Sequence, residues 1–181
     1  YTLSYQKQAA PLIFVIAGTG SSFFSTSMVF LQKSFYQAGF HVICLSSPTQ
    51  MNFITTASAT CVPGNILEDS QDLYRVMSLA WEQVKGRIKV SEFYLTGYSL
   101  GGSQAAFVAK QDEEKRVFNF KKVCMINPSV SLYTSAKILD DMLLEIDPNL
   151  TPEIFDRWFD ARLARFGEIY RMMKEPDLHH D

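Results

Sequence analysis

The chain has 181 residues, of which 47% are apolar, with a formal net charge of −2 and three cysteines. This length suits one domain and is enough to bury a sizeable core. The small net charge gives no sign of a basic surface for nucleic acid, and no apolar run reaches the length of about 18 residues that a membrane span needs. We therefore expect neither a nucleic-acid partner nor a membrane span.

Apolar runs of strand length alternate with segments of helical spacing over the first two thirds of the chain. The run at residues 11–17 is continuously apolar, which is typical of a strand covered on both faces. Strands that alternate with helices form right-handed crossovers, so we predict an α/β fold with a mostly parallel sheet and helices on both faces. The predicted strands are residues 11–17, 41–45, 92–96 and 121–126, and residues 1–10 allow an edge strand.

Apolar residues spaced by three and four predict a helix between each pair of successive strands. Residues 46–64 are rich in Ser, Thr and Pro and lack a clear period, so they predict a long loop. The predicted helices run from Met28 to Ala38, from an Asn65 cap with Glu68 in a capping-box position to Val84, and from Leu100 onward.

The alternation stops after Pro128. Apolar residues between Ile138 and Ile146 predict a short amphipathic helix, and Thr151 predicts the start of a second helix with an aromatic face. No strand is expected in residues 131–181. We divide the chain into a core at residues 1–130 and a helical cap or lid segment of the same domain at residues 131–181. Ordinary core packing of these helices is the alternative.

The most informative motif is Gly97-Tyr98-Ser99-Leu100-Gly101. A serine hydroxyl acts as a nucleophile only when it is exposed and has a base nearby. In a G-x-S-x-G turn the serine lies on a strained connection between a strand and a helix, and the glycines relieve crowding. Because a predicted strand precedes Ser99 and a helix rich in small residues follows it, the motif predicts a nucleophile. The alternative is a glycine turn needed only for backbone geometry.

This arrangement resembles the α/β-hydrolase superfamily, with the predicted strands standing for the third to sixth strands of that family's sheet. The resemblance implies a serine hydrolase, esterase-like or lipase-like, that acts on a small-molecule acyl substrate through an acyl-enzyme and uses no cofactor and no metal. The turn at Gly18-Thr19-Gly20 is similar to the family's His-Gly-x-Gly loop, with Ala17 in place of the histidine. By that match, the backbone N–H groups of Thr19 and Leu100 form the oxyanion hole.

A nucleotide site at the first glycine turn is excluded by what the turn lacks. The dinucleotide pattern needs a third glycine where the chain has Phe23, and no acidic residue ends the following strand. The chain also has no Gly-Lys-Ser or Gly-Lys-Thr triplet of a phosphate-binding loop.

The acid and the histidine that the family places after the serine have no clear match. His41 begins a strand, and the active site of a parallel sheet lies at the other ends of the strands. His180 or His179, at the end of the chain, is the candidate base. The candidate acids are Asp140, Asp141, Asp147 and Asp177.

Three explanations of this incomplete triad stay open. We favour a chain that is part of a longer protein and lacks the last strands of the fold at its C-terminus. A degenerate hydrolase fold used for binding or scaffolding is the second, and groups supplied by a partner chain are the third. The oligomeric state and the substrate are not predicted.

The cysteines bear weakly on the compartment. Cys44 and Cys124 lie in apolar runs and are expected to be buried free thiols. An odd number of cysteines does not suggest a disulfide framework, which favours the cytoplasm. Export stays open because the chain starts at Tyr1 and a leader could have been removed.

Overall fold

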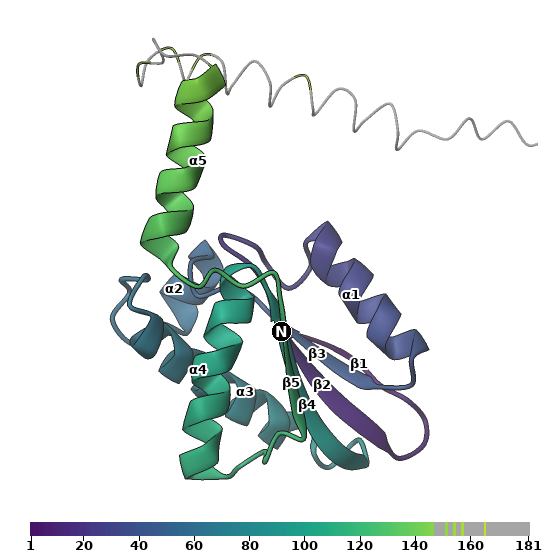
Figure 1. Cartoon of the computed structure of the whole chain (residues 1–181). Coiled ribbons are helices and arrows are strands. Elements are labelled where there is room, and N and C mark those ends of the chain that lie inside the picture. The colour runs from purple at the N-terminus through teal and green to yellow at the C-terminus, as the bar shows by residue number, and fades with distance from the viewer. Residues whose placement is uncertain (147–150, 152–153, 155–156, 158–164, 166–181) are drawn as a thin grey trace, which may run out of the picture. The chain divides into compact units, whose positions relative to one another are not determined.

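The structure is a computed structural model that describes residues 1–146 together with residues 151, 154, 157 and 165. The chain divides into two compact units, Tyr1–Val130 and Ser131–Asp181. The first unit is a five-stranded sheet with helices on both faces (Figure 1). The second unit contains helix α5, Leu132–Ile146, which includes the amphipathic helix predicted there.

The sheet has the strand order β1-β3-β2-β4-β5. Strands β2 to β5 are parallel to their neighbours, whereas β1 pairs with β3 in the antiparallel direction at one edge. The mostly parallel α/β sheet predicted from the sequence is therefore confirmed. The strands are β1 Thr2–Ser4, β2 Ala10–Ile16, β3 His41–Leu45, β4 Val90–Tyr98 and β5 Lys122–Ile126.

Both faces of the central strand β2 are buried, as its continuous apolar run predicts. Helix α1, Thr26–Gln37, covers one face, and helices α3, Ile66–Val84, and α4, Leu100–Lys115, cover the other (Figure 1). Phe14 belongs to the core on the side of α3 and α4, and its neighbour Val15 belongs to the core on the side of α1 with Met28. This alternation follows from the two-residue period of a strand.

The segment 46–64 is not a loop throughout, and this prediction was wrong. Residues Met51–Thr56 form helix α2. The Gln50 side chain accepts hydrogen bonds from the backbone N–H groups of Asn52 and Phe53, and the Phe53 side chain is buried in the core. A helix of six residues has fewer than two turns. One buried side chain in so short a helix gives no periodic pattern to recognise.

The prediction that Cys124 is buried was also wrong. Cys44 is fully buried on β3, whereas Cys124 is exposed on β5. In the described part of the chain, β5 is an edge strand. Because it has a neighbouring strand on one side only, more of its surface is exposed. An apolar run therefore predicted the strand correctly and its burial incorrectly.

The second predicted helix of residues 131–181 falls almost wholly outside the described residues. Within them, the Thr151 hydroxyl accepts a hydrogen bond from the Ile154 backbone N–H at 3.4 Å. The role of residues 131–181 as a cap or lid stays a prediction.

Candidate active site

Ser99 lies at the point where β4 ends and α4 begins. Its backbone has φ 54° and ψ −127°, a conformation that residues other than glycine rarely adopt. The turn is held on both sides: the Ser99 N–H donates to the Ile126 carbonyl, and the Gly102 N–H donates to the Ser99 carbonyl, both at 2.9 Å. Ser99 itself is exposed. The surrounding backbone thus fixes a strained serine that solvent can reach.

Gly97 and Gly101 lie where the structure has no room for a side chain. A Cβ atom at Gly97 would be 2.2 Å from the carbonyl oxygen of Gly101. A Cβ atom at Gly101 would be 2.5 Å from the carbonyl oxygens of both Ile16 and Ala17. The obstacles are backbone atoms in each case. The two glycines therefore allow strand β4, helix α4 and the end of β2 to approach one another closely.

The loop that follows β2 lies against the Ser99 turn. A Cβ atom at Gly18 would be 3.2 Å from the Ser99 Cβ, and Thr19 is the next residue along the loop. In the described part of the chain, no hydrogen bond occupies the backbone N–H of Thr19 or of Leu100. Leu100 also begins α4, where the helix dipole favours negative charge. Two N–H groups free of hydrogen bonds therefore lie next to this turn in the chain, one directly after Ser99 and one directly after Gly18.

All the predicted bases and acids fall in residues 131–181, the second unit of the chain. No side chain among the described residues forms a hydrogen bond with the Ser99 hydroxyl. Asp140 and Asp141 are exposed on α5, in the second unit. The other candidates, His179, His180, Asp147 and Asp177, lie outside the described residues. The identity of the base and of the acid stays a prediction.

His41 lies at the amino end of the parallel strands, whereas Ser99 lies at their carboxyl end. It begins β3, whereas Ser99 follows the end of β4, and both strands point the same way as β2. The imidazole is fully buried, its Nδ1 accepting from the Gln6 N–H and its Nε2 donating to the Lys89 carbonyl, both at 3.0 Å. These bonds join β3 to the segment that follows β1 and to the residue that precedes β4, which is a structural role.

A group of hydroxyls around Tyr98 was not recognised in the sequence. The Tyr98 hydroxyl lies 2.8 Å from the Ser27 Oγ and 3.1 Å from the Ser21 Oγ. Burial raises the pKa of Tyr98, but hydrogen bonds with Ser21, Ser27, the Gly18 backbone and Ser25 together hold this pKa below its ordinary value. The serines of residues 21–27 were the available signal, although nothing local indicated that they face Tyr98.

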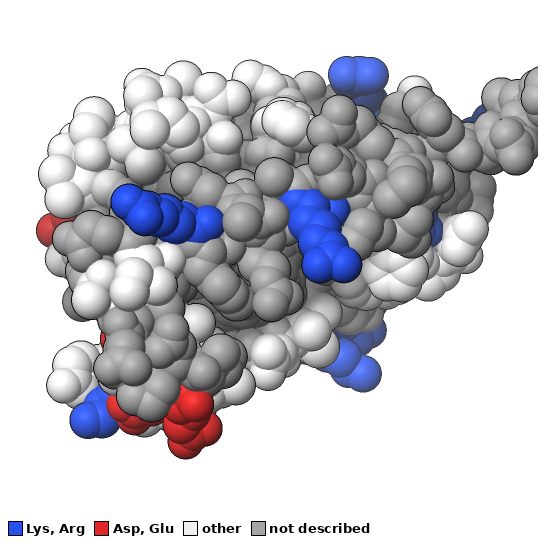
Figure 2. Space-filling view, turned by 90° about the horizontal axis from the view of Figure 1, so that it is seen from above, with Lys and Arg blue, Asp and Glu red and all other residues white. Residues whose placement is uncertain are grey.

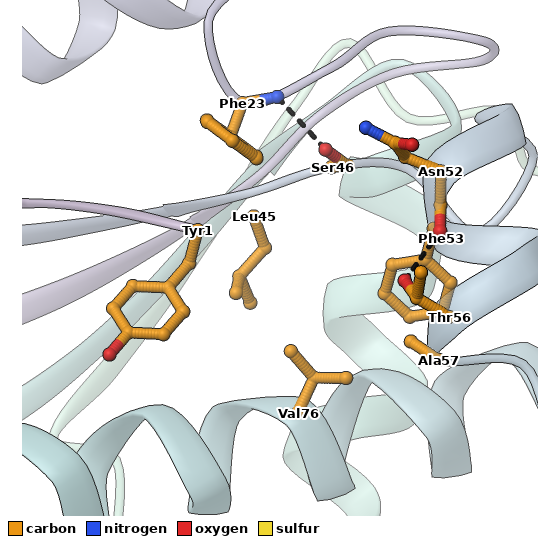
Figure 3. Close-up of a pocket in the computed structure, with 9 residues that line it drawn as sticks. All are labelled: Tyr1, Phe23, Leu45, Ser46, Asn52, Phe53, Thr56, Ala57 and Val76. Atoms are coloured by element: carbon orange, nitrogen blue, oxygen red, sulfur yellow. Dashed lines mark hydrogen bonds between the residues drawn. The ribbon is translucent and has the colours of Figure 1, made fainter.

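A pocket of about 240 Å³ opens beside the carboxyl end of β3 (Figure 3). At its rim, the Phe23 N–H donates to the Ser46 hydroxyl at 3.1 Å. Ile16 pairs with Leu45 on one side and with Gly97 on the other, so the pocket wall at Leu45 lies two strand spacings, about 10 Å, from Gly97. The lining residues are Tyr1, Phe23, Leu45, Ser46, Asn52, Phe53, Thr56, Ala57 and Val76.

The described part of the chain shows neither a metal centre nor a membrane span. Among the described residues, no group of three or more His, Cys, Asp or Glu side chains could hold a metal ion. None of the helices described is both long and apolar enough to cross a bilayer. Figure 2 colours the lysine and arginine side chains of one face blue and the aspartate and glutamate side chains red.

Comparison with known proteins finds similarity in structure but not in sequence. No family model matches the chain, and no curated protein matches it. Est1E from Butyrivibrio proteoclasticus superposes with a TM-score of 0.54 at 16% identity, covering 75% of this chain and 49% of that one. A dienelactone hydrolase from Anabaena variabilis gives a TM-score of 0.52 at 18% identity, covering 67% of this chain and 53% of that one.

A third solved structure, a brefeldin A esterase described as a bacterial homologue of human hormone-sensitive lipase, gives a TM-score of 0.53 at 12% identity, covering 73% of this chain and 37% of that one. The chain spans about half the length of the first two proteins. Sequence identities this low show a shared fold and nothing more. Since all three proteins share the α/β-hydrolase architecture and the chain superposes on them over its mostly parallel sheet and helices, the chain has the α/β-hydrolase fold.

Proposed function

We propose that this chain carries the nucleophile of a serine hydrolase, which cleaves an acyl ester or a related carboxylic derivative through an acyl-enzyme on Ser99. The observation that carries the proposal is the strained, exposed backbone of Ser99 between β4 and α4. Such strain costs about 1–3 kcal/mol and persists where the surrounding structure enforces it, often at active sites. The esterases among the structural neighbours agree with this proposal at the level of the fold.

In the proposed reaction, the Ser99 hydroxyl oxygen attacks the carbonyl carbon of the ester while a base takes the hydroxyl proton. The carbonyl oxygen becomes an oxyanion and accepts hydrogen bonds from the N–H groups of Thr19 and Leu100. Each preorganised donor of this kind contributes about 3 kcal/mol to transition-state stabilisation.

The carbon–oxygen bond of the ester then breaks, and the departing alcohol takes the proton from the base, which leaves the acyl group on Ser99. Water attacks this acyl-enzyme in the same way and releases the acid. His180 or His179 is the predicted base of both steps.

The pocket beside β3 is the proposed site for the apolar part of the substrate. Its walls are largely apolar at Leu45, Phe53 and Val76, and it lies within reach of an acyl group held at Ser99. Ferulic acid is bound to Est1E in another of the similar structures, which has a TM-score of 0.58 at 16% identity. An aromatic ester such as methyl ferulate therefore belongs beside aliphatic p-nitrophenyl esters in the substrate panel.

Labelling of the full-length protein with a fluorophosphonate tests the nucleophile directly. We expect the label on Ser99 by peptide mapping, and we expect Ser99→Ala to lose it with a nearly unchanged unfolding temperature. Ser91→Ala is the matched control, because Ser91 is an exposed serine on the same strand. A wild-type protein that takes no label and hydrolyses no ester would instead indicate a non-catalytic binding or scaffold protein that retains the fold.

A further inference from the structure

We infer that Tyr98 is a positioning residue for the oxyanion hole: its ring and its hydroxyl together hold the turn that presents the Thr19 N–H to Ser99. The inference deepens the proposed function and rests on it. It assigns a role to the variable second position of the Gly97-Tyr98-Ser99-Leu100-Gly101 motif.

The turn in question is formed by residues 18–21. The Ser21 N–H donates to the Gly18 carbonyl at 3.0 Å, so Thr19 and Gly20 are the two central residues of a β-turn. Gly20 has a φ of 65°, the positive value that the second central residue of a type II turn requires. The direction of the Thr19 N–H is therefore set by where the two ends of this turn are held.

Tyr98 contacts both ends of the turn. Its ring lies against Gly18, where an added Cβ atom would be 2.8 Å from the Tyr98 Cε2. Its hydroxyl donates to the Ser21 Oγ at 3.1 Å. On its other side, Ser21 accepts a hydrogen bond at its carbonyl from the Ser47 N–H at 2.9 Å. Ser21 is thus fixed between Ser47 and Tyr98.

The hydroxyl of Tyr98 also belongs to a closed ring of four hydroxyls. Tyr98 donates to Ser21, Ser21 donates to Ser25 at 3.2 Å, Ser25 lies 3.4 Å from Ser27, and Ser27 lies 2.8 Å from Tyr98. Each hydroxyl in such a ring can donate one bond and accept one, and the bonds strengthen one another. Because Ser25 and Ser27 lie at the start of α1, the ring joins the turn to that helix as well as to β4.

Because Tyr98 directly precedes Ser99, the hydrogen bonds of Tyr98 also bear on the proposed catalysis. Both residues move with the end of β4, so a turn held by Tyr98 keeps its place relative to the Ser99 hydroxyl. Loss of the Tyr98 hydroxyl should therefore weaken oxyanion stabilisation while leaving the binding of the substrate unchanged.

Tyr98→Phe in the full-length protein removes only the hydroxyl, and Tyr94→Phe is its matched control. Tyr94 lies on the same strand and the same face, packs in the same core cluster, and its hydroxyl donates to Glu92 at 2.9 Å away from the turn. With p-nitrophenyl butyrate we expect kcat to fall about 10-fold in Tyr98→Phe alone, with KM within about 2-fold of wild type. Hydrogen exchange of the amides of residues 18–22 should be faster in that variant alone.

Removal of the partners provides an independent check. Ser21→Ala combined with Ser27→Ala should reproduce the loss of kcat, and adding Tyr98→Phe to this pair should cause little further loss, since all three changes break one network.

The inference is overturned if Tyr98→Phe leaves exchange at residues 18–22 unchanged, or if it raises KM without lowering kcat. If the wild type neither takes the fluorophosphonate label nor hydrolyses esters, the proposed function is what fails. Exchange at residues 18–22 then still decides whether Tyr98 holds the turn.

Discussion

Gly18 and Ser99 lie so close together that a Cβ atom added at Gly18 would be 3.2 Å from the Cβ of Ser99. The two residues are close because β2 and β4 are neighbouring parallel strands in which Ile16 pairs with Gly97. The segments that follow the two strands therefore meet at the carboxyl end of the sheet. Gly18 and Ser99, which are 81 positions apart in the sequence, thus become part of one candidate site.

Gly18→Ala tests this close approach. The added methyl group would press on the ring of Tyr98 at 2.8 Å as well as on Ser99, so either this ring or the loop after β2 must shift. We expect a loss of stability of about 1–3 kcal/mol, typical of overpacking. We also expect turnover to slow by about 10-fold or more, because the Thr19 N–H moves away from the oxyanion. Thermal unfolding and steady-state kinetics measure the two effects. A variant with unchanged unfolding temperature and unchanged turnover would contradict the close approach of Gly18 to Tyr98 and Ser99.

Gly97→Ala should be more damaging than Gly18→Ala. Its methyl group would lie 2.2 Å from a backbone oxygen of α4, and backbone cannot rotate away as a side chain can. We expect a loss of about 3 kcal/mol or more in urea unfolding, or failure to fold. Gly86→Ala is the control, since a Cβ atom there meets nothing within 4 Å, and it should change stability by less than about 1 kcal/mol.

The three thiols should differ in reactivity in the native state. Burial raises the pKa of Cys44 to about 12, so at pH 8 only about one molecule in 10⁴ carries its thiolate. Cys61 and Cys124 are exposed. Alkylation at pH 8 followed by peptide mapping should modify Cys61 and Cys124 and spare Cys44 until urea is added. Rapid labelling of Cys44 in the native protein at pH 8 would argue against its burial.

The pocket beside β3 should control the length of the acyl group. Val76→Phe places a larger side chain in its lining, and we expect kcat/KM to fall about 10-fold for p-nitrophenyl octanoate with little change for the acetate. Val76→Ala enlarges the same pocket and should shift preference toward the longer ester. Equal effects of Val76→Phe on acetate and octanoate would indicate that the acyl group lies elsewhere.

Apart from helix α2, the sequence by itself was sufficient for the order of the strands and helices of the sheet unit and for the place of Ser99 between a strand and a helix. Continuous apolar runs predicted β2 to within one residue of its observed bounds and β3 at its observed bounds, because a strand covered on both faces has little freedom to carry polar residues. The glycines at 97 and 101 were equally readable, because close approach of backbone leaves glycine as the only residue that fits.

Only the tertiary structure decided what lies beside these elements. Helix α2 depends on a Gln50 cap and on burial of Phe53, and the exposure of Cys124 depends on the edge position of β5; neither leaves a periodic pattern. The ring through Tyr98, Ser21, Ser25 and Ser27 joins two segments that are distant in the chain, and hydroxyl groups carry no local sign of their partners. Local sequence therefore determined the site's strained serine, whereas packing between neighbouring strands decided what holds the loop beside it.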